Sequence, residues 1–356
     1  MKNWGRFPTF MLLSSRICAK LWFLFLLCPC IAARDFQGTI IPDPSNLHRD
    51  LPTSSNYFAV CMLFRNQDRY ISEWISYHRC IGVNHFYLYN DGSVDNFACI
   101  LRPYIKAGFV TLFHTKLKNA DGPQVVVYEH CLELMKAKKT RWTAFIDPDE
   151  FLYLDGESVD QAFTDFETFS AVQLSWVHFV SKHKQIQEEN NLVIEAYTMR
   201  ESLAHRHIVA RKSIIFAQNT TAMHVHQPEL VLGAYCTDES HTVLETCVQT
   251  GMLNAHKLYL HHYSTKSYNY FRCKALTPHA KRSGGLYRYG GQTRKEALKK
   301  IQFIYKMEVN KFARHSQEDL ALLDKKNCVV HHMEKYKEKD CKRTTCWCND
   351  CKNSLF

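Results

Sequence analysis

Three carboxylates follow one apolar segment near the middle of the chain. Asp147, Asp149 and Glu150 come directly after residues 142–146, Trp-Thr-Ala-Phe-Ile. Because Asp147 and Asp149 are two residues apart, their side chains project the same way from an extended chain and can share one hard cation. Such a cation neutralises a pyrophosphate leaving group and lowers the barrier to its departure. The sequence therefore predicts a site for a divalent cation and a phosphorylated ligand. The alternative is that these acids only cap the following turn or helix.

The surrounding pattern predicts the elements that position these acids. Continuous apolar runs alternate with segments of helical periodicity, which is typical of βαβ units. Such units build a parallel sheet with helices on both faces, and ligands bind beyond the carboxyl ends of its strands. After Phe151 the alternation gives way to short strand-like runs, which indicates a mixed second half. We expect strands at 57–64, 85–89, 109–113 and 142–146, helices at 69–81, 96–106 and 124–138, and later strands at 171–177, 192–197 and 213–216.

Length and composition narrow the class of protein. The 356 residues allow about two domains, or one large α/β domain with appendages. With 46% hydrophobic and 22% charged residues the chain is globular rather than disordered. Its net charge of +10 comes from 45 Lys and Arg against 35 Asp and Glu. Since neither a nucleic-acid-reading motif nor a basic stripe interleaved with aromatic residues is present, no nucleic-acid partner is expected.

The N-terminus indicates the secretory pathway. Residues 1–20 contain four basic residues and no acid, and residues 21–33 are almost wholly apolar. This pattern fits a cleaved signal peptide. It also fits an uncleaved signal anchor, which would make the chain a single-pass type II membrane protein with its body in the Golgi lumen. Both alternatives, membrane-anchored and secreted, stay open.

The cysteines agree with that compartment. Twelve of the fifteen follow residue 33, an even number suited to disulfides in an oxidising lumen. The last four, Cys341, Cys346, Cys348 and Cys351, could form a zinc knot instead, but their spacing is not a standard zinc pattern. One glycosylation sequon begins at Asn219.

Three ordered strings carry a family resemblance. They are Glu-Trp-Ile-Ser-Tyr-His at 73–78, Gly-Val-Asn-His-Phe-Tyr-Leu-Tyr at 82–89 and Phe-Ile-Asp-Pro-Asp-Glu-Phe-Leu at 145–152. The chain resembles glycosyltransferase family 92 from about residue 61 to 274. The resemblance implies a GT-A-like fold, in which a Rossmann-type, mixed and mostly parallel sheet with helices on both faces binds a nucleotide sugar. It also implies Mn²⁺ or another divalent cation, and inverting β-transfer of a hexose, galactose from UDP-galactose, to a glycan acceptor in the Golgi.

The resemblance also assigns site residues. Asp147 and Asp149 match the Asp-x-Asp motif that would bind the cation and the donor. Asn66 and Asp91 match positions at strand ends that would serve the ribose or uracil, and Lys266 would meet a phosphate. The third cation ligand is expected to be His262, since His262-Tyr263 and Lys266-Ser267 match the family best, and imidazole is compatible with Mn²⁺. The other histidines considered for this ligand are His224, His226 and His261.

The general base and the acceptor are not identified by the sequence. Inversion needs a carboxylate near the acceptor hydroxyl, and the options are Glu150, Glu195, Glu201 and Glu229. Glu73 and His78 lie in a matching motif but equally suit a buried structural pair. The string at 179–183 lacks the glycine usual in the family, and Pro148 replaces an apolar residue, so donor chemistry is better supported than the acceptor.

The sequence leaves two other functions open. A catalytically impaired relative would bind a sugar or glycan without transfer. A glycoside hydrolase would use paired carboxylates, but such pairs usually come from separate elements rather than positions two residues apart. The expected organisation is a signal segment at 1–33, a stem at 34–56, a glycosyltransferase domain at 57–290 and a basic, cysteine-rich extension at 291–356 that contains a helix at 295–309. This extension is either a disulfide-linked brace or a site for an anionic partner.

Overall fold

A computed structural model describes the protein at residues 38–46, 57–117, 123–156, 158–182, 187, 191–203, 211–244, 247, 255–276, 293–313 and 315–341. The chain divides into two units, 1–36 and 37–356, and every described residue belongs to the second. The predicted signal segment at 1–33 therefore lies outside the described residues. Within the described ranges, no helix has the length and apolar character needed to cross a membrane.

Four parallel strands form the centre of the main sheet in the order β4-β3-β2-β5. Along the chain, a helix follows each of β2, β3 and β4, as the sequence predicts. The strands are β2 (Phe58–Phe64), β3 (His85–Asn90), β4 (Val110–Leu117) and β5 (Trp142–Phe145), and the helices are α2 (Ile71–Cys80), α3 (Phe97–Lys106) and α4 (Pro123–Lys138). The edge strand β1 (Gly38–Pro42) pairs antiparallel with β4.

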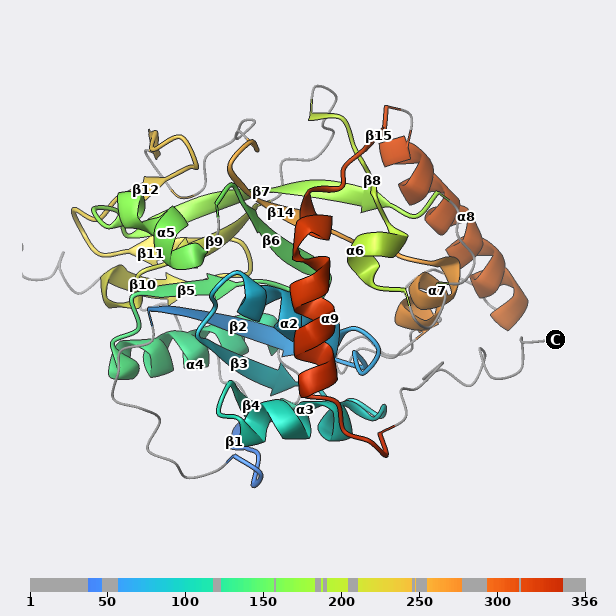
Figure 1. Cartoon of the computed structure of the whole chain (residues 1–356), viewed down its shortest axis with the longest axis horizontal. Helices are drawn as coiled ribbons and strands as arrows, with labels where there is room; N and C mark the ends of the chain where they lie inside the picture. The colour runs from blue at the N-terminus through green and yellow to red at the C-terminus, as the bar shows by residue number, and fades with distance from the viewer. Residues whose placement is uncertain are drawn as a thin grey trace, which may run out of the picture. The chain divides into compact units, whose positions relative to one another are not determined.

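The burial of strand β2 explains why its sequence is continuously apolar. Phe58, Val60 and Met62 lie in one buried core with residues of α2 and α3. Ala59 and Cys61 lie in a second core with residues of α4. The strand is thus buried on both faces, as a central parallel strand must be. Figure 1 shows α2 and α4 on different sides of the sheet.

The second half of the chain adds antiparallel strands. β9 (Arg211–Ile215) lies between β5 and β7 (Ala171–Val180) and is antiparallel to both. β14 (Leu258–His262) pairs antiparallel with β6 (Glu150–Leu154) and parallel with β7. The predicted mixed sheet with helices on both faces, the GT-A-like fold, is confirmed. Other short elements include α5 (Val159–Phe163), β8 (Met199–Arg200), β10 (Thr220–Met223), β11 (Pro228–Leu230), β12 (Cys236–Thr237), β13 (Val243–Leu244) and β15 (Gln317–Glu318).

The predicted strand at 192–197 is wrong. This segment forms the short helix α6 (Val193–Ala196). The buried carboxylate of Glu73 in α2 accepts hydrogen bonds from the backbone N–H groups of Val193 (2.9 Å) and Ile194 (3.2 Å). A carboxylate at these first N–H groups stabilises a helix start. Its partner is 120 residues away, so local periodicity could not reveal it.

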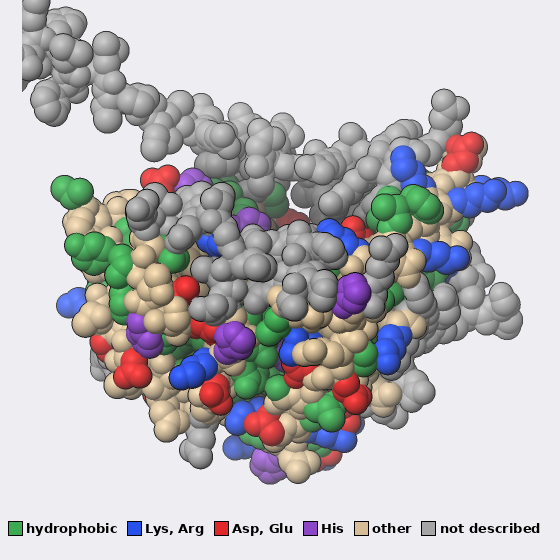
Figure 2. Space-filling view, turned by 90° about the horizontal axis from the view of Figure 1, so that it is seen from above, with side chains coloured by type: hydrophobic (Ala, Val, Ile, Leu, Met, Phe, Trp, Pro, Cys, Tyr) green, Lys and Arg blue, Asp and Glu red, His purple; other side chains and the backbone are tan. Residues whose placement is uncertain are grey.

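The C-terminal part packs onto the same unit. The predicted helix is α8 (Arg294–Ala313), and α9 (Lys326–Lys335) follows it. In Figure 1, α9 (red) crosses in front of α2, to which the Cys80–Cys328 disulfide joins it. In Figure 2, Lys and Arg side chains project at the right-hand edge, where Figure 1 places α8. Acidic side chains are interspersed over the same face.

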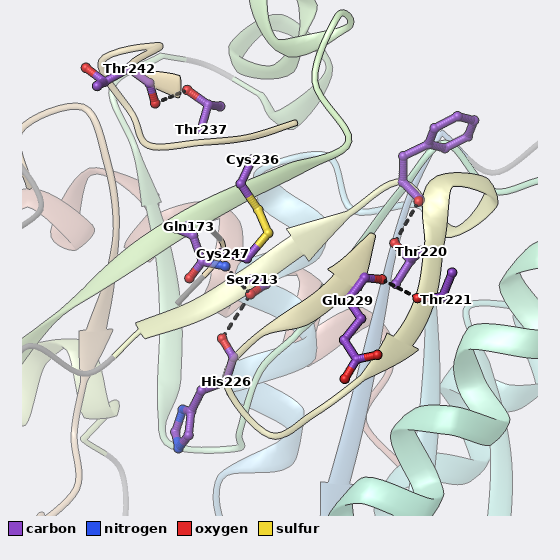
Figure 3. Close-up of a disulfide and its surroundings, with 11 residues drawn as sticks. Gln173, Ser213, Thr220, Thr221, His226, Glu229, Cys236, Thr237, Thr242 and Cys247 are labelled. Atoms are coloured by element: carbon purple, nitrogen blue, oxygen red, sulfur yellow. Dashed lines mark hydrogen bonds between the residues drawn. A yellow bond between two sulfur atoms is a disulfide. The ribbon is translucent and has the colours of Figure 1, made fainter. Parts of the chain in front are cut away.

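The predicted disulfides are confirmed. Besides Cys80–Cys328, pairs join α3 to the chain after α9, β2 to α4, and β12 to a nearby loop (Figure 3). These pairs are Cys99–Cys341, Cys61–Cys131 and Cys236–Cys247. Cys341 is therefore a disulfide cysteine rather than a zinc ligand, while the other three of its group lie outside the described residues.

Loop length predicts which disulfide stabilises the fold more. Cys80–Cys328 closes a separation of 248 residues and Cys236–Cys247 one of 11. Because Cys99–Cys341 remains in place, the loop that Cys80–Cys328 closes in the unfolded chain shortens to roughly 30 residues, and in the chain-entropy model the two losses are about 4 and about 3 kcal/mol. We expect the double Cys→Ser variant of the first pair to lose more unfolding free energy in urea than that of the second. An equal loss would contradict the chain-entropy model for this protein.

Candidate active site

The acidic motif lies at the turn between β5 and β6. The backbone N–H of Glu150 donates to the carbonyl of Asp147 (3.0 Å), which closes the turn. The indole of Trp74 in α2 donates to the carbonyl of Glu150 (2.7 Å). The N–H of Tyr263, just after β14, donates to the carbonyl of Asp149 (2.8 Å). Helix α2 and the segment after β14 thus hold the turn in place at the carboxyl end of the parallel strands.

The carboxylate of Asp147 is held by α4 and β9. Gln124 of α4 donates to Oδ1 (2.7 Å), and the ammonium of Lys212 lies 2.9 Å from Oδ2. Lys212 reaches this place because Ala144 pairs with Ile214 in the antiparallel β5–β9 ladder, so residue 212 extends to the end of β5. Its side chain is fully buried. Sequence reasoning missed Lys212; the one available signal is a lysine directly before a predicted strand.

Glu150 lies behind Asp147. Its Oε2 accepts from the backbone N–H of Asp147 (2.7 Å) and is 3.9 Å from the ammonium of Lys212. Burial raises the pKa of Glu150 well above its usual range, although Lys212 opposes the shift. Burial would lower the pKa of Lys212, but Asp147 and Glu150 raise it above its usual value. Lys212 is therefore charged, and Glu150 serves the structure of the turn.

Asp149 is buried and faces two cationic or basic groups. Its Oδ1 is 3.8 Å from Nε2 of His262, and its Oδ2 is 2.9 Å from the ammonium of Lys274 in α7 (Tyr268–Leu276). Burial alone would raise the pKa of Asp149, but Lys274, aided by His262 and Lys266, holds it well below its usual range. The carboxylate is therefore ionised.

His262 is positioned by two strand ladders. In β14 it pairs with Glu150 of β6 and with His178 of β7. Burial lowers the pKa of His262 to about 4 despite the opposing charge of Asp149, so its imidazole is neutral near pH 7. His178, which sequence reasoning missed, lies with its ring 4.9 Å from that of His262 and is stacked on Phe312 of α8. Neither ring nitrogen of His178 has a hydrogen-bond partner in the described part of the chain.

A divalent cation fits the pair formed by Asp149 and His262. A carboxylate oxygen and a neutral imidazole nitrogen 3.8 Å apart are suitable donors for one such ion. Among the described residues, no three His, Cys, Asp or Glu side chains cluster into a complete cation site. Two protein ligands leave positions for phosphate oxygens and water. Asp147, the other predicted ligand, is turned toward Gln124 and Lys212.

Lys266 lies in an aromatic enclosure near Asp149. It is 1% exposed, and its ammonium is 4.6 Å from the ring centre of Tyr70 and 4.4 Å from that of Tyr270. Its backbone has φ +42°, a left-handed conformation that costs free energy in a residue other than glycine. The ammonium has no hydrogen-bond partner in the ranges that the structure describes. A buried, unpaired cation in strained backbone is typical of a ligand site.

Asn66 and Asp91 follow β2 and β3, as predicted. Asn66 has φ +53°, and its side-chain oxygen accepts from the N–H of Val94 (2.9 Å), which ties the two loops together. Asp91 accepts from the hydroxyl of Thr115 (3.3 Å) and lies 3.8 Å from the guanidinium of Arg65. Both residues are thus at the expected sheet edge.

The other candidate histidines have different neighbours. His224 pairs with Glu229 (2.9 Å) on an exposed hairpin. The ring of His226 meets the carbonyl of Arg211 (2.8 Å), and its own carbonyl accepts from Ser213 (Figure 3). His261 points to the opposite side of β14 from His262, as neighbouring strand residues do.

The remaining candidate acids also have defined contacts. Glu195 pairs with Lys326 of α9. Glu201 accepts from the backbone N–H of His178 (2.9 Å), the residue that pairs with His262 in the β7–β14 ladder. His78 is wholly buried; its Nδ1 bonds the carbonyl of Trp74, and its Nε2 accepts from the N–H of Leu152. The hydrogen bonds of His78, like those of Glu73, give this residue a structural role.

The mixed sheet with helices on both faces and the acidic turn at its carboxyl edge are the features expected of a GT-A-like fold. Residues 56–282 match the model of glycosyltransferase family 92. Since this match covers more than half of the chain, the chain belongs to glycosyltransferase family 92, as its motifs predict.

Curated relatives share that family name. A family 92 protein of Ricinus communis is 32% identical over 100 residues, which are 27% of this chain and 17% of that protein. One of Oryza sativa subsp. japonica is 33% identical over 104 residues, 29% of this chain and 17% of that protein. The matched segments are thus about a sixth of the length of these relatives.

Solved structures match more distantly. S. aureus TarS 1–349 in complex with UDP has a TM-score of 0.30 and 14% identity, over 45% of this chain and 46% of that one. Core-mannan synthase A of Aspergillus fumigatus, in a Mn/GDP form, has a TM-score of 0.22 and 9% identity, over 37% and 45% of the two chains.

The buried Lys212 predicts a stability effect. Lys212→Met removes the only cation that directly contacts both Asp147 and Glu150 among the described residues. Breaking a buried ion pair costs about 3–5 kcal/mol, which urea unfolding would measure. The added change Asp147→Asn should recover part of the loss, while exposed Lys106→Met should cost little. Additive losses in the double variant would contradict the pairing.

His78 predicts a pH dependence of stability. Burial lowers its pKa from 6.5 to about 3. Between these values the unfolded chain binds the proton and the folded chain does not, so the stability from His78 is complete above pH 6.5 and is lost as pH falls. Between pH 7 and pH 5 this residue should account for about 2 kcal/mol. Urea unfolding of His78→Gln should show a shallower pH slope, whereas the exposed His331→Gln controls for loss of any histidine; equal slopes would contradict the assignment.

Proposed function

We propose that the protein is a cation-dependent, inverting glycosyltransferase that transfers a hexose from a UDP-sugar to a glycan hydroxyl. The observation that carries this proposal is the Asp149–His262 pair, at 3.8 Å, beside two lysines at the carboxyl edge of the sheet. The family membership supports glycosyl transfer. The family resemblance supports galactose as the hexose, UDP-galactose as the donor, a β-linkage in the product and Mn²⁺ as the cation.

We assign side chains to the cation, the diphosphate and the nucleoside of the donor by their charge and position. Asp149 and His262 would hold the cation, which screens the diphosphate as the bond to the sugar breaks. Lys266 would meet a phosphate oxygen as a point charge. Asp91 and Asn66 would bind or position the nucleoside at the ends of β2 and β3. Asp147, fixed by Lys212 and Gln124, would present its carboxylate to the donor beside the cation.

Inversion places the acceptor hydroxyl opposite the departing UDP, with a base to take its proton. Of the candidate carboxylates, Glu150 is fully buried in the acidic turn. Glu195 forms an ion pair with Lys326, and Glu229 pairs with His224. Glu201 accepts from the backbone N–H of His178, which pairs with His262. These contacts assign the base to none of the four carboxylates.

The disulfides support a proposal for the compartment. Four disulfides within the described residues suit an oxidising lumen rather than the cytosol. We propose the Golgi or another secretory lumen, with residues 1–33 as either an anchor or a cleaved signal.

The test is a titration of the purified chain with UDP, with and without Mn²⁺. Mn²⁺ should strengthen UDP binding, and Asp149→Asn should weaken it about 100-fold in the presence of Mn²⁺, since a cation contributes several kcal/mol at a diphosphate. Exposed Asp160→Asn is the matched control.

Transfer itself is tested with UDP-galactose and a panel of glycan acceptors. Cation-dependent UDP binding without any transfer would favour a catalytically impaired sugar-binding relative. Folded protein that binds UDP equally with and without Mn²⁺, or equally well as Asp149→Asn, would overturn the proposed donor site.

A further inference from the structure

The carboxylate of Asp149 contacts two side chains that differ in their exposure to solvent. Oδ1 faces Nε2 of His262, an internal group of the sheet, and Oδ2 receives the ammonium of Lys274 at 2.9 Å. The side chain of Asp149 is 5% exposed, whereas that of Lys274 is 48% exposed. Lys274 therefore reaches the buried carboxylate from the solvent side, as a long side chain on α7 can.

We propose that Lys274 is a counter-ion of Asp149 that makes the cation and the diphosphate bind interdependently. This inference rests on the proposed function. A cation that arrives alone meets a carboxylate already neutralised by an ammonium, and the two positive charges repel. A diphosphate supplies negative charge that attracts both positive groups, so the cation and the nucleotide favour each other.

The other lysines near the site differ from Lys274 in their enclosure. Lys212 is fully buried between Asp147 and Glu150, so its ammonium is fixed to the turn. Lys266 is 1% exposed and lies between two tyrosine rings. Of these three, Lys274 alone combines direct contact with Asp149 and a side chain open to solvent. It can remain on Oδ2 or turn to a phosphate, since a bound cation would then neutralise Asp149 in its place.

The inference predicts two effects of opposite sign. In Lys274→Gln the amide can still donate to Asp149, but the charge is gone. Mn²⁺ alone should then bind about tenfold more tightly, while UDP at saturating Mn²⁺ should bind about tenfold more weakly, within the usual range of coupling between two ligands. A residue that only supports the fold would weaken both.

The experiment uses the full chain and follows free Mn²⁺ by electron paramagnetic resonance, with and without UDP. Lys274→Arg keeps the charge and should behave like the wild type. Lys106→Met removes an exposed charge at the far end of α3 and should change neither affinity. Adding Asp149→Asn to Lys274→Gln should abolish the gain in Mn²⁺ affinity. Circular dichroism verifies folding, and Lys274→Met gives a second neutral variant.

The outcomes separate this inference from the proposed function. Wild type that binds Mn²⁺, together with Lys274→Gln or Lys274→Met of equal or weaker Mn²⁺ affinity, would overturn the role of Lys274 alone. Wild type that binds no Mn²⁺ even with UDP would overturn the proposed cation site itself.

Discussion

Neutralising carboxylates at the end of a buried strand is the requirement on which the site depends. Asp147 and Glu150 meet it through Lys212, which is wholly enclosed. Burying an isolated charge there costs much free energy, so Lys212 has to be buried together with the carboxylates of Asp147 and Glu150. It arrives because β9 is antiparallel to β5, which brings the first residues of β9 to the carboxyl end of β5. The antiparallel pairing of β9 with β5 in this mixed sheet is therefore part of the chemistry of the site.

The small ladder of β6, β14 and β7 does the same for the basic side of the site. It sets His262 opposite Glu150 and beside His178, and the backbone of Tyr263 fixes the turn that carries Asp149. Strand β14 thus carries His262, and the backbone just after it fixes the turn that carries Asp149, while long lysine side chains adjust the charge around both. Residues on strands hold their geometry more precisely than residues on unsupported loops.

The sequence predicts the parts of this fold that depend on local pattern. The central strands, their helices and the polar residues at their ends follow from periodicity, and the family strings locate Asp147, Asp149 and His262. Contacts between distant segments are not encoded in that way. Glu73 turns a strand-like stretch into α6 from 120 residues away, and Lys212 and Lys274 acquire their roles only when β9 and α7 fold against the acidic turn. Apart from the place of Lys212 directly before a predicted strand, neither lysine stands in a pattern that distinguishes it from a surface residue.

The long-range disulfides have a consequence for biosynthesis. Cys80 and Cys99, in the first two helices after β2, find their partners at Cys328 and Cys341, near the end of the chain. Neither bond can close until almost the whole polypeptide has been made. Until then the emerging chain presents free thiols, and wrong pairs must be exchanged by thiolate attack. Formation of these two bonds is thus a post-translational event that needs an oxidant for the thiols, and truncation near the C-terminus would leave the early helices without their covalent partners.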